Sequence, residues 1–236
     1  MSNIKQVVIL AGGKGTRMKE MTSDLPKPMV EIGGIPVLDH LINIFENFGK
    51  FKFVVCTGYL GNIIQKHYKN SSNVTVVDTG IDTNTGGRVS KIKKILEENF
   101  IVTYGDGLAN VNIKDLLEFH QKKDTLGTIT VTNPTSRFGL VEYNTQNLVT
   151  NFVEKPKLKE FINIGFMVFK KDFVNYLNFD SVLETKPLQN LVLEKQLSAY
   201  VHKGYFEPMD TYREYLQLNK YWDSGKIPWQ EFKKQV

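Results

Sequence analysis

Two basic side chains follow a glycine-rich turn near the start of the chain, and their spacing indicates chemistry on phosphate groups. The turn at 12–15 comes directly after an apolar, β-branched run at 7–10 that is typical of a buried parallel strand. Glycines let the backbone approach a ligand closely, and consecutive N–H groups there can form an anion-binding concavity. Arg17 and Lys27 add two fixed positive charges. The stretch predicts a nucleoside-triphosphate site at the C-terminal end of the first strand, where open α/β sheets bind ligands.

Two other phosphate-binding motifs fail on spacing. A dinucleotide fingerprint needs a third glycine where Met18 stands, and the P-loop pattern does not occur. An ordinary strand and turn followed by a basic helix start is the structural alternative. The length of the pattern argues against this structural alternative, because GGxGTR at 12–17 is followed by PKPM at 26–29.

Two later glycine motifs have both a ligand-binding and a structural interpretation. Asp106 lies between two glycines at the end of an apolar run, where an open carboxylate could hold Mg²⁺, although such tripeptides also make simple turns. Gly86 and Gly87 begin a helical segment that extends to residue 98, with Arg88 in its first turn. The motif permits close approach of an anion, and a capped surface helix is an equal alternative. His120, near a helix end, is interpreted as structural or solvated.

Composition limits the class of protein. The 236 residues suffice for one domain, predicted to span 1–236, and 41% hydrophobic and 23% charged residues are ordinary for a globular protein. The net charge of +5 is spread along the chain, which argues against nucleic-acid binding. The single Cys56 lies in an apolar run and is expected to be a buried thiol. Neither a signal peptide nor a membrane-spanning stretch is visible, so we expect no membrane partner and a cytoplasmic location.

Apolar periodicity predicts the elements that position these residues. Strands at 7–10, 51–57, 74–77 and 100–104 alternate with helices at 36–48, 62–68 and 89–98, which is the doubly wound α/β order. Asn112 is expected, itself or through its neighbour, to cap a helix that ends near residue 120. Short strands at 140–143, 148–154 and 161–169 predict a small antiparallel layer laid against the parallel core. A further amphipathic helix is predicted at 211–222.

Several motifs in a fixed order carry a resemblance to a known family. They are GGKGTR (12–17), PKPM (26–29), VDTG (77–80), TGGR (85–88), TYGDG (103–107), RFG (137–139), EKP (154–156) and PMDT (208–211). Each is weak alone, but the ordered set resembles the sugar-1-phosphate nucleotidyltransferases over residues 7–229, and within them the branch that uses CTP and glucose 1-phosphate. The resemblance implies a Rossmann-like, mostly parallel sheet flanked by helices with an inserted antiparallel layer.

The resemblance also implies the reaction and its residues. A sugar 1-phosphate oxygen attacks the α-phosphorus of CTP, pyrophosphate leaves, and Mg²⁺ is required. Arg17 and Lys27 would be catalytic, Asp106 and Asp210 would bind Mg²⁺, and Lys155, Glu154, Asn163 and Gly165 would bind the sugar phosphate. The nucleotide would contact Leu10, Ala11, Gly12, Gly13, Gly15, Thr16, Gly86, Gly87, Arg88 and Asp106. The partners expected are CTP, a sugar 1-phosphate and further copies of the chain in a homo-oligomer.

Two departures from the family pattern bear on specificity and assembly. Ile164 stands where the family has a glycine after Asn163, which could reshape the sugar pocket. The link at 69–73 is shorter than usual, so the oligomer could differ. The alternatives left open are the same chemistry with another sugar phosphate, UTP or dTTP, and a non-catalytic nucleotide-binding regulatory subunit.

Overall fold

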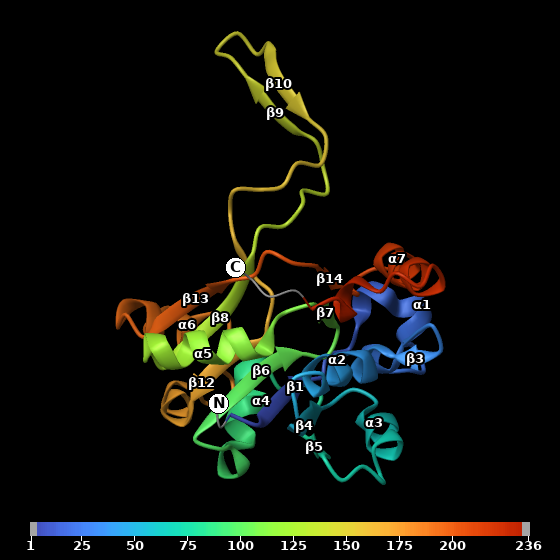
Figure 1. The fold of residues 1–236 in the computed structure, drawn as a ribbon, viewed down its shortest axis with the longest axis vertical. Helices are drawn as coiled ribbons and strands as arrows, with labels where there is room; N and C mark the ends of the chain where they lie inside the picture. Colours follow the sequence, from blue (N-terminus) through green and yellow to red (C-terminus); the bar gives the residue numbers. More distant parts are fainter. Residues whose placement is uncertain (1–3, 233–236) are drawn as a thin grey trace.

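A mixed, mostly parallel β-sheet forms the centre of the computed structural model, which describes residues 4–232 (Figure 1). Its strands are β1 (Gln6–Leu10), β4 (Lys52–Thr57), β5 (Val74–Asp78), β6 (Asn99–Tyr104), β8 (Gly127–Thr132), β11 (Ile162–Asn163), β12 (Met167–Lys170) and β13 (Leu197–Val201). Their order is β11-β8-β12-β6-β1-β4-β5, and β13 also pairs with β8. Only the pairs made by β11 and β12 are antiparallel. The predicted fold class is confirmed.

Helices cover both faces of this sheet. They are α1 (Lys19–Thr22), α2 (Val37–Glu46), α3 (Gly61–His67), α4 (Thr85–Lys91), α5 (Ile113–Lys123), α6 (Lys186–Leu193) and α7 (Tyr212–Asp223). Apolar side chains of α2, α3, α5 and α7 belong to one buried cluster, and those of α4 and α6 belong to another. Asn112 caps α5 by accepting from the Asp115 N–H, which confirms that prediction. No helix among residues 4–232 has the length and apolarity needed to span a bilayer.

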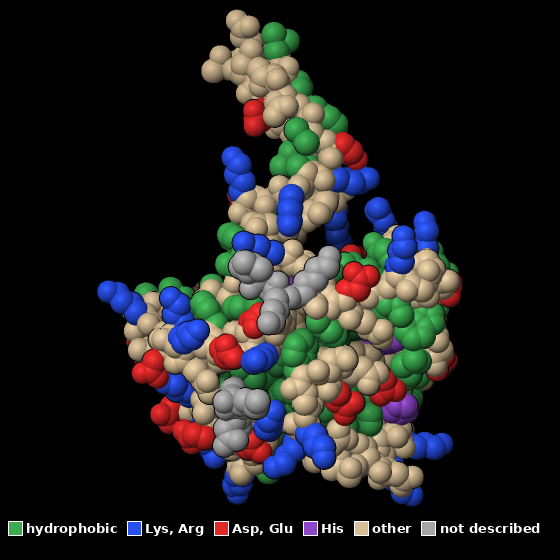
Figure 2. All heavy atoms as spheres, viewed as in Figure 1, with side chains coloured by type: hydrophobic (Ala, Val, Ile, Leu, Met, Phe, Trp, Pro, Cys, Tyr) green, Lys and Arg blue, Asp and Glu red, His purple; other side chains and the backbone are tan. Residues whose placement is uncertain are grey.

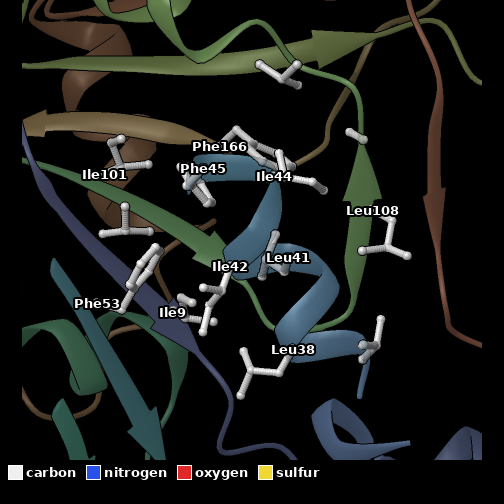
Figure 3. Packing of buried hydrophobic residues seen from close by; sticks show 14 of the residues in the cluster. Ile9, Leu38, Leu41, Ile42, Ile44, Phe45, Phe53, Ile101, Leu108 and Phe166 are labelled. Carbon is white, nitrogen blue, oxygen red and sulfur yellow. The ribbon is translucent and has the colours of Figure 1, made fainter. Parts of the chain in front are cut away.

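The first strand explains how both clusters form. Val7 and Ile9 point into one cluster, whereas Val8 and Leu10 point into the other, because successive strand residues face opposite sides of a sheet. All five residues of β1 are buried. Figure 3 shows Leu41 of α2 lying over the strands that carry Ile9 and Phe53. Residues 7–10 are accordingly apolar, as the sequence indicates, whereas the buried Gln6 at the start of β1 donates to the Ile95 carbonyl and accepts from the Glu97 N–H.

The parallel strands end together at one edge. Leu10 pairs with Cys56 on one side and with Tyr104 on the other, and Thr57 pairs with Asp78. A small antiparallel sheet at this edge joins β7 (Gly107–Ala109) to β14 (Phe206–Pro208), and another joins β2 (Glu31–Ile32) to β3 (Ile35–Pro36). The β7–β14 pairing brings the chain after β6 next to the chain before α7, although the two are about a hundred residues apart.

The inserted strands differ from the expected layer against the core. The strands β9 (Leu140–Tyr143) and β10 (Val149–Val153) form a hairpin, here called the arm, that projects from the body (Figure 1). Every residue of both strands is exposed, so neither face of the arm packs on the sheet. The predicted strand at 161–169 divides into β11 and β12, because Gly165 and Phe166 take positive φ angles of 79° and 49°.

One further prediction needs adjustment, and another stays untested. The helix expected to run to residue 98 ends at Lys91, and a 3-10 turn at Lys93–Ile95 follows before β6. The predicted single domain, 1–236, stays a prediction, and its ends at 1–3 and 233–236 lie outside the described residues.

Candidate active site

A cleft of about 350 Å³ opens at the edge where the parallel strands end. Segments that follow β1 and β6 and precede α4 and α7 form its walls. The lining residues are Leu10, Ala11, Gly12, Gly13, Gly15, Thr16, Arg17, Lys27, Pro28, Thr83, Asn84, Thr85, Arg88, Tyr104, Gly105, Asp106 and Asp210. The structure therefore brings together the predicted glycine turn, both predicted catalytic cations and both predicted metal carboxylates.

Lys27 lies between two carboxylates from distant parts of the chain. Its Nζ is 2.5 Å from Asp106 Oδ2 and 2.7 Å from Asp210 Oδ1, and its side chain is only 11% exposed. Burial alone would lower the pKa of Lys27, but the two carboxylates outweigh it and the pKa is raised. Burial would likewise raise the pKa of Asp210, but Lys27 and Arg17 lower it. Both groups are therefore charged near neutral pH.

Hydrogen bonds of the backbone fix the two carboxylates. The Gly105 N–H donates to the Leu10 carbonyl, which holds the turn bearing Asp106 against the end of β1. The Met209 N–H donates to the Asp106 carbonyl, and Met209 is fully buried. Asp210 is thereby anchored beside Asp106 through its neighbour in sequence.

The donor set fits a magnesium ion. Asp106 and Asp210 offer carboxylate oxygens, the hard ligands that Mg²⁺ prefers. Among the described residues no cluster of three or more His, Cys, Asp or Glu side chains could hold a metal. Mg²⁺ commonly binds through one or two protein carboxylates, with water and substrate phosphates as its other ligands. Two acidic groups on a phosphate-sized cleft match that pattern better than a closed protein cage would.

Arg17 reaches the same carboxylate from solvent. A 3-10 turn, Thr16–Met18, presents it after Gly15, whose φ of 61° lets the chain reverse. Its Nη1 is 2.6 Å from Asp210 Oδ2, and its side chain is 70% exposed. Arg17 is thus placed at the mouth of the cleft, free to contact a bound anion.

Arg88 differs from its predicted orientation. The sequence predicts that it projects into the site; it contributes to the lining of the cleft but is only 4% exposed and contacts the glycine turn. Its guanidinium donates to the carbonyls of Thr57 (2.7 Å) and Gly12 (3.0 Å), and to Thr79 Oγ1 (2.6 Å). Burial lowers its pKa. Because these donors are used by the chain itself, Arg88 stabilises the glycine turn, and its contact with a base or phosphate stays a prediction.

This arrangement predicts an asymmetry between neighbouring glycines. A Cβ on Gly12 would lie 2.0 Å from Arg88 Nη1, whereas a Cβ on Gly13 would have nothing within 4 Å. We expect Gly12→Ala to lower the free energy of unfolding by about 1–3 kcal/mol, the usual cost of overpacking. Gly13→Ala, the matched control, should leave that stability unchanged. Urea denaturation of both variants checks the prediction, and equal stabilities would contradict it.

Gly86 and Gly87 allow a close approach, but to the protein rather than to a ligand. A Cβ on Gly87 would lie 2.2 Å from the Phe179 carbonyl oxygen, and one on Gly86 would lie 2.8 Å from Ser181 Cβ. The Gly87 N–H donates to the Ser181 carbonyl at 3.0 Å. The predicted nucleotide contacts of these two glycines are therefore taken up by the segment before α6, and neither lines the cleft.

Glu154 and Lys155 lie at the root of the arm and line no part of the first cleft. Lys155 lines a second cleft of about 670 Å³, to which Pro208 and Thr211 also contribute. Both side chains are about half exposed and pair with each other at 3.2 Å. The segment that leads into α7 borders both clefts, since Asp210 lines the first, and Pro208 and Thr211 line the second.

Asn163 and Gly165 meet the first cleft through Tyr104. A Cβ on Gly165 would lie 3.0 Å from the Tyr104 ring, and Asn163 accepts from the Gly165 N–H. The Tyr104 hydroxyl donates to Glu184 at 2.5 Å. Burial, followed by the Glu184 charge, raises the pKa of Tyr104 and keeps it a neutral phenol.

Ile164 does not shape either cleft. It is 3% exposed and belongs to the buried cluster that contains Phe166. The expectation that it reshapes a sugar pocket is therefore not supported by its buried position.

A different result is consequently expected from changing it. Ile164→Ala should lower the free energy of unfolding by about 2–5 kcal/mol, as truncations in well-packed cores do. The ratio of kcat/KM values for two acceptor sugars should stay as in the wild type. Urea denaturation measures the first quantity and steady-state kinetics the second. A stable variant with a changed sugar preference would contradict this and indicate that Ile164 shapes the sugar pocket.

Some lining residues were not predicted as site residues. They are Pro28, Thr83, Asn84, Thr85, Tyr104 and Gly105. All adjoin a predicted motif, since Thr83–Thr85 precede Gly86 and Tyr104 precedes Gly105-Asp106. The position of these motifs near the ends of parallel strands could have predicted them, because residues next to a motif lie at the same edge of the sheet.

Comparisons with known proteins agree with this geometry. The family described as "Nucleotidyl transferase" matches residues 6–227. The glucose-1-phosphate cytidylyltransferase of Salmonella typhimurium is 36% identical over a 253-residue alignment covering 95% of this chain and 98% of that protein. The crystal structure of HddC from Yersinia pseudotuberculosis superposes with a TM-score of 0.72 at 26% identity, covering 93% of this chain and all of that one. HddC complexed with GMP-PN gives a TM-score of 0.70.

Proposed function

The chain belongs to the nucleotidyl transferase family, and on that premise we propose that it joins CTP to glucose 1-phosphate, forming CDP-glucose and pyrophosphate. The observation that carries the proposal is the placement of Lys27 between Asp106 and Asp210, beside a glycine turn at the carboxyl edge of the sheet. The choice of CTP and glucose 1-phosphate is supported by the Salmonella relative, which matches this chain over nearly its whole length.

The proposed reaction is one displacement at the α-phosphorus of CTP. An oxygen of the sugar phosphate forms the new bond, and the bond from that phosphorus to the β-phosphate oxygen breaks as pyrophosphate leaves. Such transfers depend on alignment and on neutralising negative charge. N–H groups of the turn around Gly12 and Gly13 would hold the triphosphate. Arg17 and Lys27 would offset the charge that develops as the leaving group departs.

Asp106 and Asp210 would hold the divalent cation that this chemistry implies. When bound, Mg²⁺ supplies charge neutralisation and orientation of phosphate oxygens. The chain contributes the carboxylates, and it also supplies Lys27, whose charge helps to lower the pKa of Asp210.

The acceptor would bind beside residues 208–211, which border both clefts. Lys155 is proposed to anchor the sugar phosphate, and Glu154 and Asn163 to accept hydrogen bonds from sugar hydroxyls beside Gly165. Support comes from the basic residues at the root of the arm, visible in Figure 2, of which Arg137, Lys155 and Lys157 line the second cleft together with Arg213 of α7. An anionic substrate would be attracted to that surface.

We further propose that the protein is a homo-oligomer. The arm exposes Tyr143, Val149 and Phe152 by 69%, 63% and 61%. An isolated two-stranded hairpin is marginally stable in water, so burial of these side chains against another copy would stabilise it. Light scattering should give a mass above the 27.0 kDa of one chain. The substitution Phe152→Ser should shift the measured mass toward the mass of one chain. A wild type of single-chain mass would contradict the proposal.

The test of the activity is pyrophosphate release with Mg²⁺ across a grid of nucleoside triphosphates and sugar 1-phosphates. Release confined to CTP with glucose 1-phosphate is expected. Release with another triphosphate or sugar would keep the reaction and change the substrates. Binding of CTP without release from any pair would favour a regulatory subunit.

A further inference from the structure

Glu214 connects the start of α7 to the candidate active site. It is the third residue of α7, and its Oε2 accepts from the Asp210 N–H at 2.7 Å and the Thr211 N–H at 2.9 Å. The side chain of Thr211 in turn accepts from the Glu214 backbone, which completes a capping box. An ordinary capping box needs only the bond to Thr211. The additional bond to Asp210 restrains the residue whose carboxylate contacts Lys27 and Arg17.

The other oxygen of Glu214 is held from the root of the arm. Arg137 Nη2 donates to Glu214 Oε1 at 2.6 Å, and the Glu214 side chain is only 11% exposed. A carboxylate so far from water needs charged and hydrogen-bonded partners. Arg137 supplies the positive charge that pairs with Glu214. Its own side chain is 60% exposed, so it covers Glu214 only in part.

A second carboxylate, Glu207, also interacts with that cation. Burial and the charge of Glu214 raise the pKa of Glu207, while the charges of Arg137 and Arg213 lower it. Two acidic groups thus lie close together on the wall of the second cleft. Without Arg137, Glu214 would face the charge of Glu207 with less compensation and would hold the Asp210 backbone less firmly.

We infer that Glu214 is a positioning residue that fixes Asp210 for the bound metal–nucleotide complex, with Arg137 holding Glu214 in place. This rests on the proposed function, in which Asp210 binds the cation. Asp210 receives three restraints: two cations on its carboxylate, and Glu214 on its backbone. The pair of Arg137 and Glu214 also ties the root of the arm to the active-site wall.

The affinity of the full chain for Mn²⁺–CTP, measured by water-proton relaxation without any acceptor sugar, tests this inference. Glu214→Ala is expected to weaken binding about 10–100-fold, the usual effect of removing a residue that orients a metal ligand. Glu214→Gln keeps an oxygen that can accept from the Asp210 N–H, so it should restore most of the affinity. Arg137→Ala should weaken binding in the same direction by a smaller factor.

Thr211→Ala is the matched control, because it removes the other half of the capping box and leaves the Asp210–Glu214 bond. It should weaken the helix start, seen as a lower Tm, without changing the affinity for Mn²⁺–CTP. Wild-type affinity in a folded Glu214→Ala variant, or an equal loss in Thr211→Ala, would overturn the inference. A wild type that fails to bind Mn²⁺–CTP would instead overturn the proposed function on which it rests.

Discussion

Asp210→Asn is expected to lower the turnover number for CTP and glucose 1-phosphate by about 10²–10³-fold, comparable to losing one group that stabilises transition-state charge. Asparagine keeps the size of the side chain but removes the charge that pairs with Lys27 at 2.7 Å and Arg17 at 2.6 Å. It also removes half of the proposed cation site. Asp106→Asn should have an effect of similar size, since Asp106 is the other carboxylate on Lys27.

Steady-state kinetics at saturating Mg²⁺ measure this effect, and circular dichroism checks that the fold is intact. Asp82→Asn is the control, because Asp82 lies near the cleft but pairs with Lys14 at 3.3 Å and is 84% exposed. The control should retain wild-type turnover. Near-normal turnover in either Asp106→Asn or Asp210→Asn would remove the metal assignment.

Arg17→Ala is expected to reduce turnover on the order of 10²–10³-fold while weakening CTP binding much less. The side chain lies at the mouth of the cleft, is 70% exposed, and pairs with Asp210. Its charge would matter most when negative charge gathers on the leaving pyrophosphate. A group that acts on the transition state more than on the bound substrate changes turnover more than affinity.

Single-turnover kinetics and direct measurement of the dissociation constant of CTP separate the two effects. Lys14→Ala offers a control of the same charge in the same loop, because Lys14 lies against Asp82 and does not line the cleft. Equal losses in affinity and in kcat/KM for Arg17→Ala would assign Arg17 to binding of the ground state instead.

Local patterns were enough to predict the first strand and the position of the site. A strand buried on both faces must be apolar throughout, and residues 7–10 are. Parallel strands end at a common edge, so glycine and acidic motifs that follow them are gathered there. Arg17, Lys27, Asp106 and Asp210 accordingly line one cleft, although they span most of the chain.

Side-chain direction and long-range packing could not be predicted in the same way. Arg88 lies beneath the turn because carbonyls of Thr57 and Gly12, distant in sequence, take its hydrogen bonds. Gly86 and Gly87 admit a segment almost a hundred residues away. Ile164 packs into the buried cluster that contains Phe166, and the bond from Glu214 to Asp210 depends on where α7 begins.

The projecting arm could not be predicted for a related reason. Alternating and apolar strand patterns do not reveal whether a hairpin packs on its own sheet or on another molecule. The sequence around Phe152 suits either outcome, and its 61% exposure shows that it does not pack on the sheet of its own chain.

The most direct test of the proposed reaction follows the α-phosphate. The protein is incubated with CTP labelled with ³²P at that position, glucose 1-phosphate and Mg²⁺, with Asp210→Asn in parallel. We expect the label in a sugar-linked product that resists phosphatase, with unlabelled pyrophosphate released in equal amount and little product from the variant. Label recovered as CMP or left in CTP, or equal product from the variant, would contradict displacement at the α-phosphorus by this site.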